Sequence, residues 1–209
     1  MCVILACDTV KPDLDTLKKC EEANKDGGGV AWLDKASGLV HWKKGIKAEE
    51  IAETIQYVNP PLIVHFRFST VGGAFPALCH PFPIDDRCSV ELEGRTQRVL
   101  FHNGHWADWQ EAMMTVVLAS GKKLPGGAWS DSRALAYIVR HCGRTFLNLV
   151  NQTQKVAILS KDGIFLSGFP WTEREGIMYS NLLPFSCGYN YRRGGYWKNG
   201  TFHGFEQGA

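Results

Sequence analysis

Apolar and polar positions follow two different spacings along the chain. Apolar residues recur three to four positions apart, with charged residues between them, where we predict helices, at residues 12–24, 48–58, 106–119 and 130–142. Shorter apolar runs bounded by Gly, Pro, Asn or Asp predict strands at residues 2–7, 30–33, 39–42, 62–68, 98–101, 145–150, 155–159 and 164–166. The mixture favours an α+β fold.

Two stretches follow neither spacing. Residues 71–86 are rich in Gly and Pro and are predicted to form a long loop, which in a compact domain usually has a function. After Asn181 the pattern weakens into an aromatic and basic stretch at residues 189–198. Because no repeat or linker is visible, we expect one domain over residues 1–209, with a core at about 2–180 and an irregular C-terminal segment at about 181–209.

The composition is that of an ordinary globular protein. Of the 209 residues, 44% are hydrophobic and 21% are charged, which excludes a disordered, collagenous or coiled-coil chain. A net charge of +2 gives no general attraction to nucleic acid or anionic membranes. No apolar run approaches the roughly 18 residues of a membrane span, and Asp8 follows the first apolar run too early for a secretion signal. We expect a cytoplasmic protein without membrane contact, and a small-molecule partner.

The cysteines and histidines do not predict a metal site. The seven cysteines are an odd number and include no Cys-x-x-Cys pair, which favours reduced thiols over a disulfide framework or a zinc site. His102 and His105 are spaced as in some metal sites, but they lie at a predicted strand-to-loop turn, and no cluster of Cys or carboxylates completes the ligand shell. We therefore expect no cofactor and no metal.

Cys2 is the residue most informative about chemistry. Removal of Met1, which a small second residue permits, would leave a thiol and a free α-amine on the same residue. The thiol is a strong nucleophile, and an α-amine with a pKa of about 7.7–8.0 is a suitable general base. The alternative is that Cys2 is only a small buried residue in a strand.

Five further segments accompany Cys2. They are Asn24-Lys25-Asp26-Gly27-Gly28-Gly29-Val30-Ala31, His65-Phe66-Arg67-Phe68-Ser69-Thr70-Val71-Gly72, His80-Pro81, His102-Asn103-Gly104 and Ser130-Asp131-Ser132. In this order the chain resembles the class II glutamine amidotransferases of the N-terminal nucleophile hydrolase superfamily, and the glycine run resembles their smaller, stand-alone members. The resemblance covers residues 2 to about 180. It implies a four-layer αββα sandwich, in which two antiparallel sheets are flanked by helices.

The resemblance also implies roles for individual residues. Cys2 would attack the side-chain amide of glutamine and form a glutamyl thioester, with release of ammonia and then glutamate. The Asn103 side chain and the Gly104 backbone N–H would stabilise the oxyanion. Arg67 would hold the substrate α-carboxylate and Asp131 its α-ammonium group, with Thr70 also in the substrate-binding set. His80 and His102 also match family positions, and we expect them to shape loops.

Each of these residues has a simpler interpretation. Arg67 could be a surface residue at a strand end, Asn103-Gly104 only a tight turn, and Asp131 only an acid at a helix start. The chain also departs from the family pattern, with Phe68 where many members have tryptophan and Val71 where some have histidine. Both positions flank the substrate pocket, so they bear on its depth and its lid.

The sequence leaves the acceptor and the substrate open. Larger family members continue into a domain that receives the ammonia, so an acceptor here would be a separate synthetase subunit. Within the superfamily, an amidase for a γ-glutamyl amide or another C–N bond is the nearest alternative, because Arg67 and Asp131 would read the same glutamyl end. A nucleic-acid-binding module using Tyr189 to Lys198 is a weaker alternative, since the net charge is small.

Overall fold

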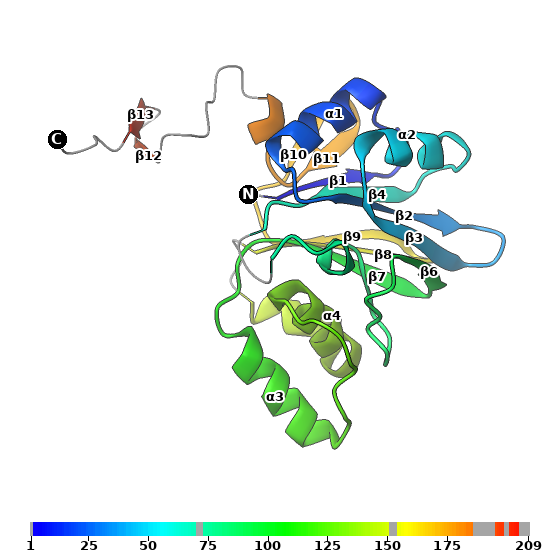
Figure 1. Ribbon diagram of the computed structural model, residues 1–209, viewed down its shortest axis with the longest axis vertical. Helices are drawn as coiled ribbons and strands as arrows, with labels where there is room; N and C mark the ends of the chain where they lie inside the picture. The colour runs from blue at the N-terminus through cyan, green and yellow to red at the C-terminus, as the bar shows by residue number, and fades with distance from the viewer. Residues whose placement is uncertain (1, 70–72, 151–153, 186–194, 199–200, 205–209) are drawn as a thin grey trace.

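The structure is a computed structural model, and it describes residues 2–69, 73–150, 154–185, 195–198 and 201–204. The main body has four layers (Figure 1): two helices, a seven-stranded sheet, a four-stranded sheet and a second pair of helices. Every strand pairing in both sheets is antiparallel. The predicted αββα sandwich is therefore confirmed.

The larger sheet contains the strands on which the predicted site depends. In spatial order it consists of β10 (Thr172–Arg174), β11 (Ile177–Tyr179), β1 (Val3–Cys7), β4 (Leu62–Phe66), β2 (Gly28–Asp34), β3 (Leu39–Ile46) and β6 (Glu93–Thr96). β1 and β4 are buried at every residue, because they are central strands covered on both faces. This explains why both appear in the sequence as continuous apolar runs.

The smaller sheet lies against the inner face of the larger one. Its order is β5 (Phe82–Pro83), β7 (Arg98–Asn103), β8 (Lys155–Ser160) and β9 (Gly163–Ser167). Side chains from both sheets form the core between them, including Ile4, Ile63, Val99, Phe101 and Leu159. Alternate residues of each strand point into this layer, as the period of two requires.

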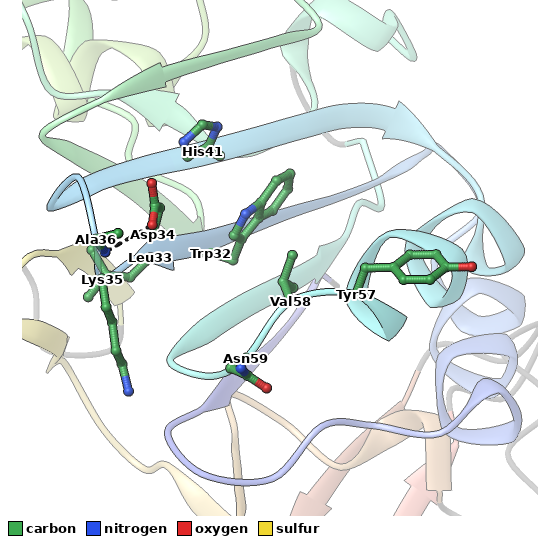
Figure 2. Close-up of a pocket in the computed structure, with 9 residues that line it drawn as sticks. All are labelled: Trp32, Leu33, Asp34, Lys35, Ala36, His41, Tyr57, Val58 and Asn59. Carbon is green, nitrogen blue, oxygen red and sulfur yellow. Dashed lines mark hydrogen bonds between the residues drawn. The ribbon is translucent and has the colours of Figure 1, made fainter.

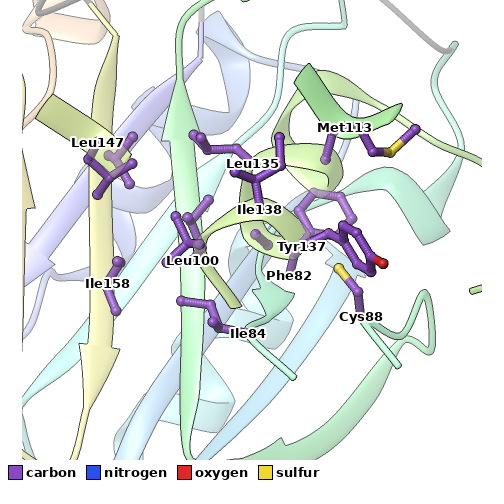
Figure 3. Packing of buried hydrophobic residues seen from close by; sticks show 14 of the residues in the cluster. Phe82, Ile84, Cys88, Leu100, Met113, Leu135, Tyr137, Ile138, Leu147 and Ile158 are labelled. Atoms are coloured by element: carbon purple, nitrogen blue, oxygen red, sulfur yellow. The ribbon is translucent and has the colours of Figure 1, made fainter. Parts of the chain in front are cut away.

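The helices cover the outer faces. α1 (Leu14–Ala23) and α2 (Ala48–Gln56) pack on the larger sheet through Leu17, Cys20, Ile51 and Ile55. α4 (Asp131–Cys142) packs on the smaller sheet, and α3 (Trp109–Ser120) packs beside α4. Figure 3 shows this second core, where Leu135 and Ile138 of α4 meet Leu100 of β7. None of the described helices is long and apolar enough to cross a membrane.

One predicted strand is wrong. Residues 145–150 lie largely in a 3₁₀ helix, Arg144–Asn148, instead of a strand. Its backbone amides bond three residues back, as in Phe146 N to Gly143 O at 3.2 Å and Val150 N to Leu147 O at 3.3 Å. Leu147 and Val150 are buried in the helix-side core, and a spacing of three places both on one face of a 3₁₀ turn.

The structure also contains elements that the sequence did not predict. β6, β10 and β11 are edge or near-edge strands of three or four residues; β6 and β10 consist of polar residues and glycine, and β11 is too short for a clear apolar pattern. The 71–86 stretch contains a 3₁₀ turn, Pro76–Leu78, and the short strand β5, and a third 3₁₀ turn covers Leu183–Phe185. In the C-terminal segment β12 (Gly195–Lys198) and β13 (Thr201–Gly204) form a two-stranded sheet.

Candidate active site

Cys2 lies at one end of the central strands of the larger sheet. The pairing of Val3 with Phe66 in the β1–β4 ladder brings Cys2 next to the residues that follow β4. Its Sγ atom lies 3.3 Å from the backbone nitrogen of Phe68, which donates a hydrogen bond to it. On the other side, the Asn181 side chain donates to the Cys2 carbonyl at 2.5 Å. The backbone and the thiol of Cys2 are thus both held in place.

The Cys2 thiol borders a pocket built from segments far apart in the sequence. The pocket is small, with about 330 Å³ of space between atoms when the solvent at its open mouth is included. It is lined by Cys2, Arg67, Phe68, Ser69, Leu78, His80, His102, Gly104, Ser130, Asp131 and Ser132. Four of the six predicted site residues therefore line one pocket. Asn103 adjoins it, and Thr70 lies outside the described residues.

The environment of Cys2 keeps its thiol neutral in the resting protein. Burial raises the pKa of the thiol, and the Phe68 N–H and the positive charge of Arg67 oppose this rise only partly. A neutral thiol reacts poorly as a nucleophile unless a base accepts its proton during attack. The geometry therefore suits a mechanism in which a base acts directly on Cys2.

Arg67 is buried, contrary to its interpretation as a surface residue, with 5% of its area exposed. Its backbone extends β4 by pairing with the glycine segment, since Arg67 N donates to Gly27 O at 2.9 Å and Asp26 N donates to Arg67 O at 3.0 Å. The Arg67 side chain donates to Gly73 O at 2.6 Å. A guanidinium group carries five N–H donors in a planar fork, a geometry that suits a carboxylate.

The glycine segment shapes the wall of the pocket. A Cβ atom at Gly29 would lie 1.9 Å from the carbonyl oxygen of His80. Only glycine therefore lets the His80–Pro81 segment lie directly against β2. Asp26 supports the neighbouring loop by accepting a hydrogen bond from Ser69 N at 2.6 Å.

Asn103 and Gly104 follow directly from the end of β7. The Asn103 side chain is buried, and its Nδ2 donates to Ser180 Oγ at 2.8 Å. Ser180 Oγ also accepts a hydrogen bond from Ile4 N at 2.9 Å, which ties Asn103 to the strand that carries Cys2. A carboxamide nitrogen has two hydrogens, so one remains for a ligand.

Asp131 is the first residue of α4 and is held at a fixed orientation. One carboxylate oxygen accepts from Ser132 N at 2.8 Å and the other from Trp106 N at 3.2 Å. Ser130 caps the helix by accepting from Arg133 N at 3.2 Å. Asp131 therefore does stabilise a helix start, as its simpler interpretation proposed, but it also faces the pocket that contains Cys2.

The histidines behind the pocket are neutral. His65 and His80 are buried with ring centroids 4.0 Å apart. Burial lowers the pKa of His65 to about 3 and also lowers that of His80 well below its usual value. His80 lies in a loop, as expected, whereas His102 lies within β7 and bonds to Ser132 and Gln154. Among the described residues no group of three or more His, Cys, Asp or Glu could hold a metal ion.

Sequence reasoning missed three residues that support the site: Gln154, Ser180 and Asn181. They belong to no motif, and each precedes or follows a short strand. Ser180 and Asn181 could have been found only from their position directly after β11, which pairs with β1. Because β11 was not predicted, that position could not be recognised.

Two solved structures share this architecture. One is described as glutamine phosphoribosylpyrophosphate amidotransferase from B. subtilis, complexed with ADP and GMP, and aligns with a TM-score of 0.57 at 13% identity. The other, described as the allosteric regulatory enzyme of purine biosynthesis, aligns with a TM-score of 0.59 at 13% identity. The chain has the N-terminal nucleophile hydrolase type of fold.

The likeness covers most of this chain and less than half of its neighbours. The alignments include 88% of the chain but only 42% and 43% of the two solved chains. No model of a protein family matches the sequence, and no curated protein matches it. At 13% identity the comparison establishes the fold alone.

Proposed function

We propose that this protein is a glutamine amidotransferase-type amidohydrolase with Cys2 as its nucleophile. The observation that carries the proposal is the pocket in which Cys2, Arg67, Gly104 and Asp131 meet from four separate segments. A nucleophile, a cation, an anion and a backbone N–H beside a glycine are the groups that hydrolysis of a free amino acid amide requires. The fold shared with an amidotransferase agrees with this assignment.

Recognition would use both charged ends of the substrate. The Arg67 guanidinium group binds the α-carboxylate, for which its planar fork is suited, and the Asp131 carboxylate binds the α-ammonium group. Thr70 completes the substrate-binding set in this proposal. These contacts place the side-chain amide at the Cys2 thiol.

Catalysis would begin with the removal of Met1, which exposes the α-amine of Cys2. The amine accepts the thiol proton as sulfur attacks the amide carbon, and the oxyanion binds the free Nδ2 hydrogen of Asn103 and the N–H of Gly104. The protonated amine then gives its proton to the departing nitrogen, which leaves as ammonia. Water attacks the thioester, which releases glutamate and restores the thiol.

An amidase for γ-glutamyl amides uses the same contacts, because Arg67 and Asp131 bind only the glutamyl end. A separate subunit that accepts the ammonia is part of the amidotransferase proposal.

The test is an assay of purified protein for glutamate and for ammonia. Glutamine, asparagine and a panel of N-substituted γ-glutamyl amides are compared at equal concentrations. We expect glutamine to give equimolar glutamate and ammonia, with asparagine inert because its chain is one methylene shorter. Hydrolysis of the substituted amides but not of glutamine would support the amidase, and hydrolysis of none would overturn both.

A further inference from the structure

Gln154 bridges the end of β7 and the turn that follows it. It directly precedes β8, and the pairing of Asn103 with Lys155 places it beside Gly104. Its Nε2 donates to the carbonyl oxygen of His105 at 2.7 Å, and its Oε1 lies 2.8 Å from His102 Nε2. One side chain thus contacts both ends of the segment that contains Asn103 and Gly104.

The contact with His105 fixes the direction of the other hydrogen bonds. A carbonyl oxygen only accepts, so the nitrogen of the Gln154 amide must face His105 and its oxygen must face His102. His102 Nε2 therefore carries the hydrogen. Burial lowers the pKa of His102, so its ring is neutral, and its Nδ1 accepts from the hydroxyl of Ser132 at 3.0 Å.

The same arrangement gives a reason for the glycine at position 104. A Cβ atom there would lie 1.9 Å from Gln154 Oε1 and 2.9 Å from His102 Nε2. A side chain at position 104 would therefore displace the carboxamide of Gln154, so the close approach of the two requires glycine.

We propose that Gln154 is a positioning residue that aligns the Asn103–Gly104 turn and fixes the Nε2–H tautomer of His102. The inference rests on the proposed function, in which this turn stabilises the oxyanion. Because Ser132 follows Asp131 in α4, the chain of hydrogen bonds also ties the turn to the residue that binds the α-ammonium group. Gln154 itself lies outside the residues that line the pocket.

The activity test compares Gln154→Glu and Gln154→Ala with the control Gln97→Glu. Gln154→Glu keeps the shape of the side chain but removes the hydrogens that bond His105, and Gln97 is exposed on the turn between β6 and β7. We expect kcat with glutamine to fall by about 10- to 100-fold in both Gln154 variants, with KM nearly constant, since second-layer positioning residues have effects of this size. The control should match the wild type. A rise in KM alone, or wild-type kcat in Gln154→Glu, would overturn the inference.

A second measurement does not depend on substrate. The nitrogen NMR shifts of the His102 ring report which nitrogen carries the hydrogen, and we expect Nε2–H in the wild type and loss of that preference in Gln154→Ala. An Nδ1–H ring in the wild type would overturn the inference even if Gln154→Ala unfolded. If His102 carries its hydrogen on Nε2 but the protein hydrolyses no glutamyl substrate, the proposed function is wrong, while the hydrogen bonds of Gln154 and His102 are as described.

Discussion

The larger sheet has a hollow at each end, and the two differ in how their residues are held. At the end opposite Cys2, a hollow of about 900 Å³, including its open mouth, lies over the β2–β3 hairpin and the segment before β4 (Figure 2). The Cys2 pocket has about 330 Å³. In the larger hollow, the Asp34 side chain accepts hydrogen bonds from Ala36 N and Ser37 Oγ within its own turn, and Trp32 stacks on His41 across the hairpin.

The polar groups at the Cys2 end are held by distant segments instead. Cys2 is fixed by Phe68 and Asn181, and Asn103 by Ser180, at sequence separations of 66, 179 and 77. Such contacts can be maintained only by the assembled fold. This convergence of anchored polar groups, more than the size of a hollow, is our reason to place the proposed chemistry at the Cys2 pocket.

The largest expected effect comes from removing the nucleophile. Cys2→Ala should reduce glutaminase activity to background, because Cys2 is the one thiol among the described residues that line the pocket. The control is Cys142→Ala, which changes an exposed thiol at the end of α4. Circular dichroism and steady-state kinetics check both variants. Wild-type turnover in Cys2→Ala would mean that the smaller pocket is not the reactive one.

An uncleavable N-terminal extension should be almost as damaging. With Met1 retained, the nitrogen of Cys2 is an amide, which does not accept a proton at neutral pH. Because burial raises the pKa of the Cys2 thiol, the thiol stays neutral and has no base to accept its proton. The extended protein should fold but remain inactive. Intact-mass analysis and activity assays of both forms check this. Full activity of the extended form would point to His102 or His65 as the base.

Asn103→Ala should act on turnover. Loss of one oxyanion donor typically lowers kcat by about 10²- to 10³-fold, with little change in KM. Because Asn103 also bonds Ser180, the variant Ser180→Ala serves as the comparison, and we expect it to retain more of kcat since it leaves the donor in place. Equal losses of kcat in the two variants would indicate that Asn103 maintains the structure of the site and does not bind the oxyanion.

Arg67→Lys should act on substrate binding. A bidentate carboxylate contact becomes a point charge, and a hydrogen bond to a charged group contributes about 1.5–3 kcal/mol, or roughly 10- to 100-fold in KM. We expect kcat to change much less. Steady-state kinetics with glutamine check the division between KM and kcat. A fall in kcat at constant KM in Arg67→Lys would mean that the roles proposed for Arg67 and Asn103 are assigned the wrong way round.

Local patterns in the sequence predicted most of the fold. The central strands β1 and β4 and helices α1, α2 and α4 could be located from apolar spacing, because burial on one or both faces determines that spacing. The short edge strands could not, since β6 and β10 have no fully buried residue and their pairing depends on neighbours distant in sequence. Tertiary packing also explains why Arg144–Asn148 form a 3₁₀ helix instead of the predicted strand.

The site could be predicted only through its motifs. The resemblance supplied Cys2, Arg67, Gly104 and Asp131, and the structure brings all four to one pocket. It did not supply Gln154 or Ser180, because a residue that supports another by a single hydrogen bond leaves no pattern of its own. Their contacts to His102 and Asn103 appear only once β7, β8 and β11 are placed.

The smallest effect is expected at the larger hollow. His41→Ala removes the ring that stacks on Trp32 at 5.6 Å between centroids, and cross-strand pairs of this kind contribute roughly 0.2–1 kcal/mol to stability. Chemical denaturation should show a loss of that size, while kcat and KM for glutamine stay within about twofold of the wild type, because the two hollows share no described lining residue. A tenfold loss of activity without a matching loss of stability would show that the two ends of the sheet are coupled.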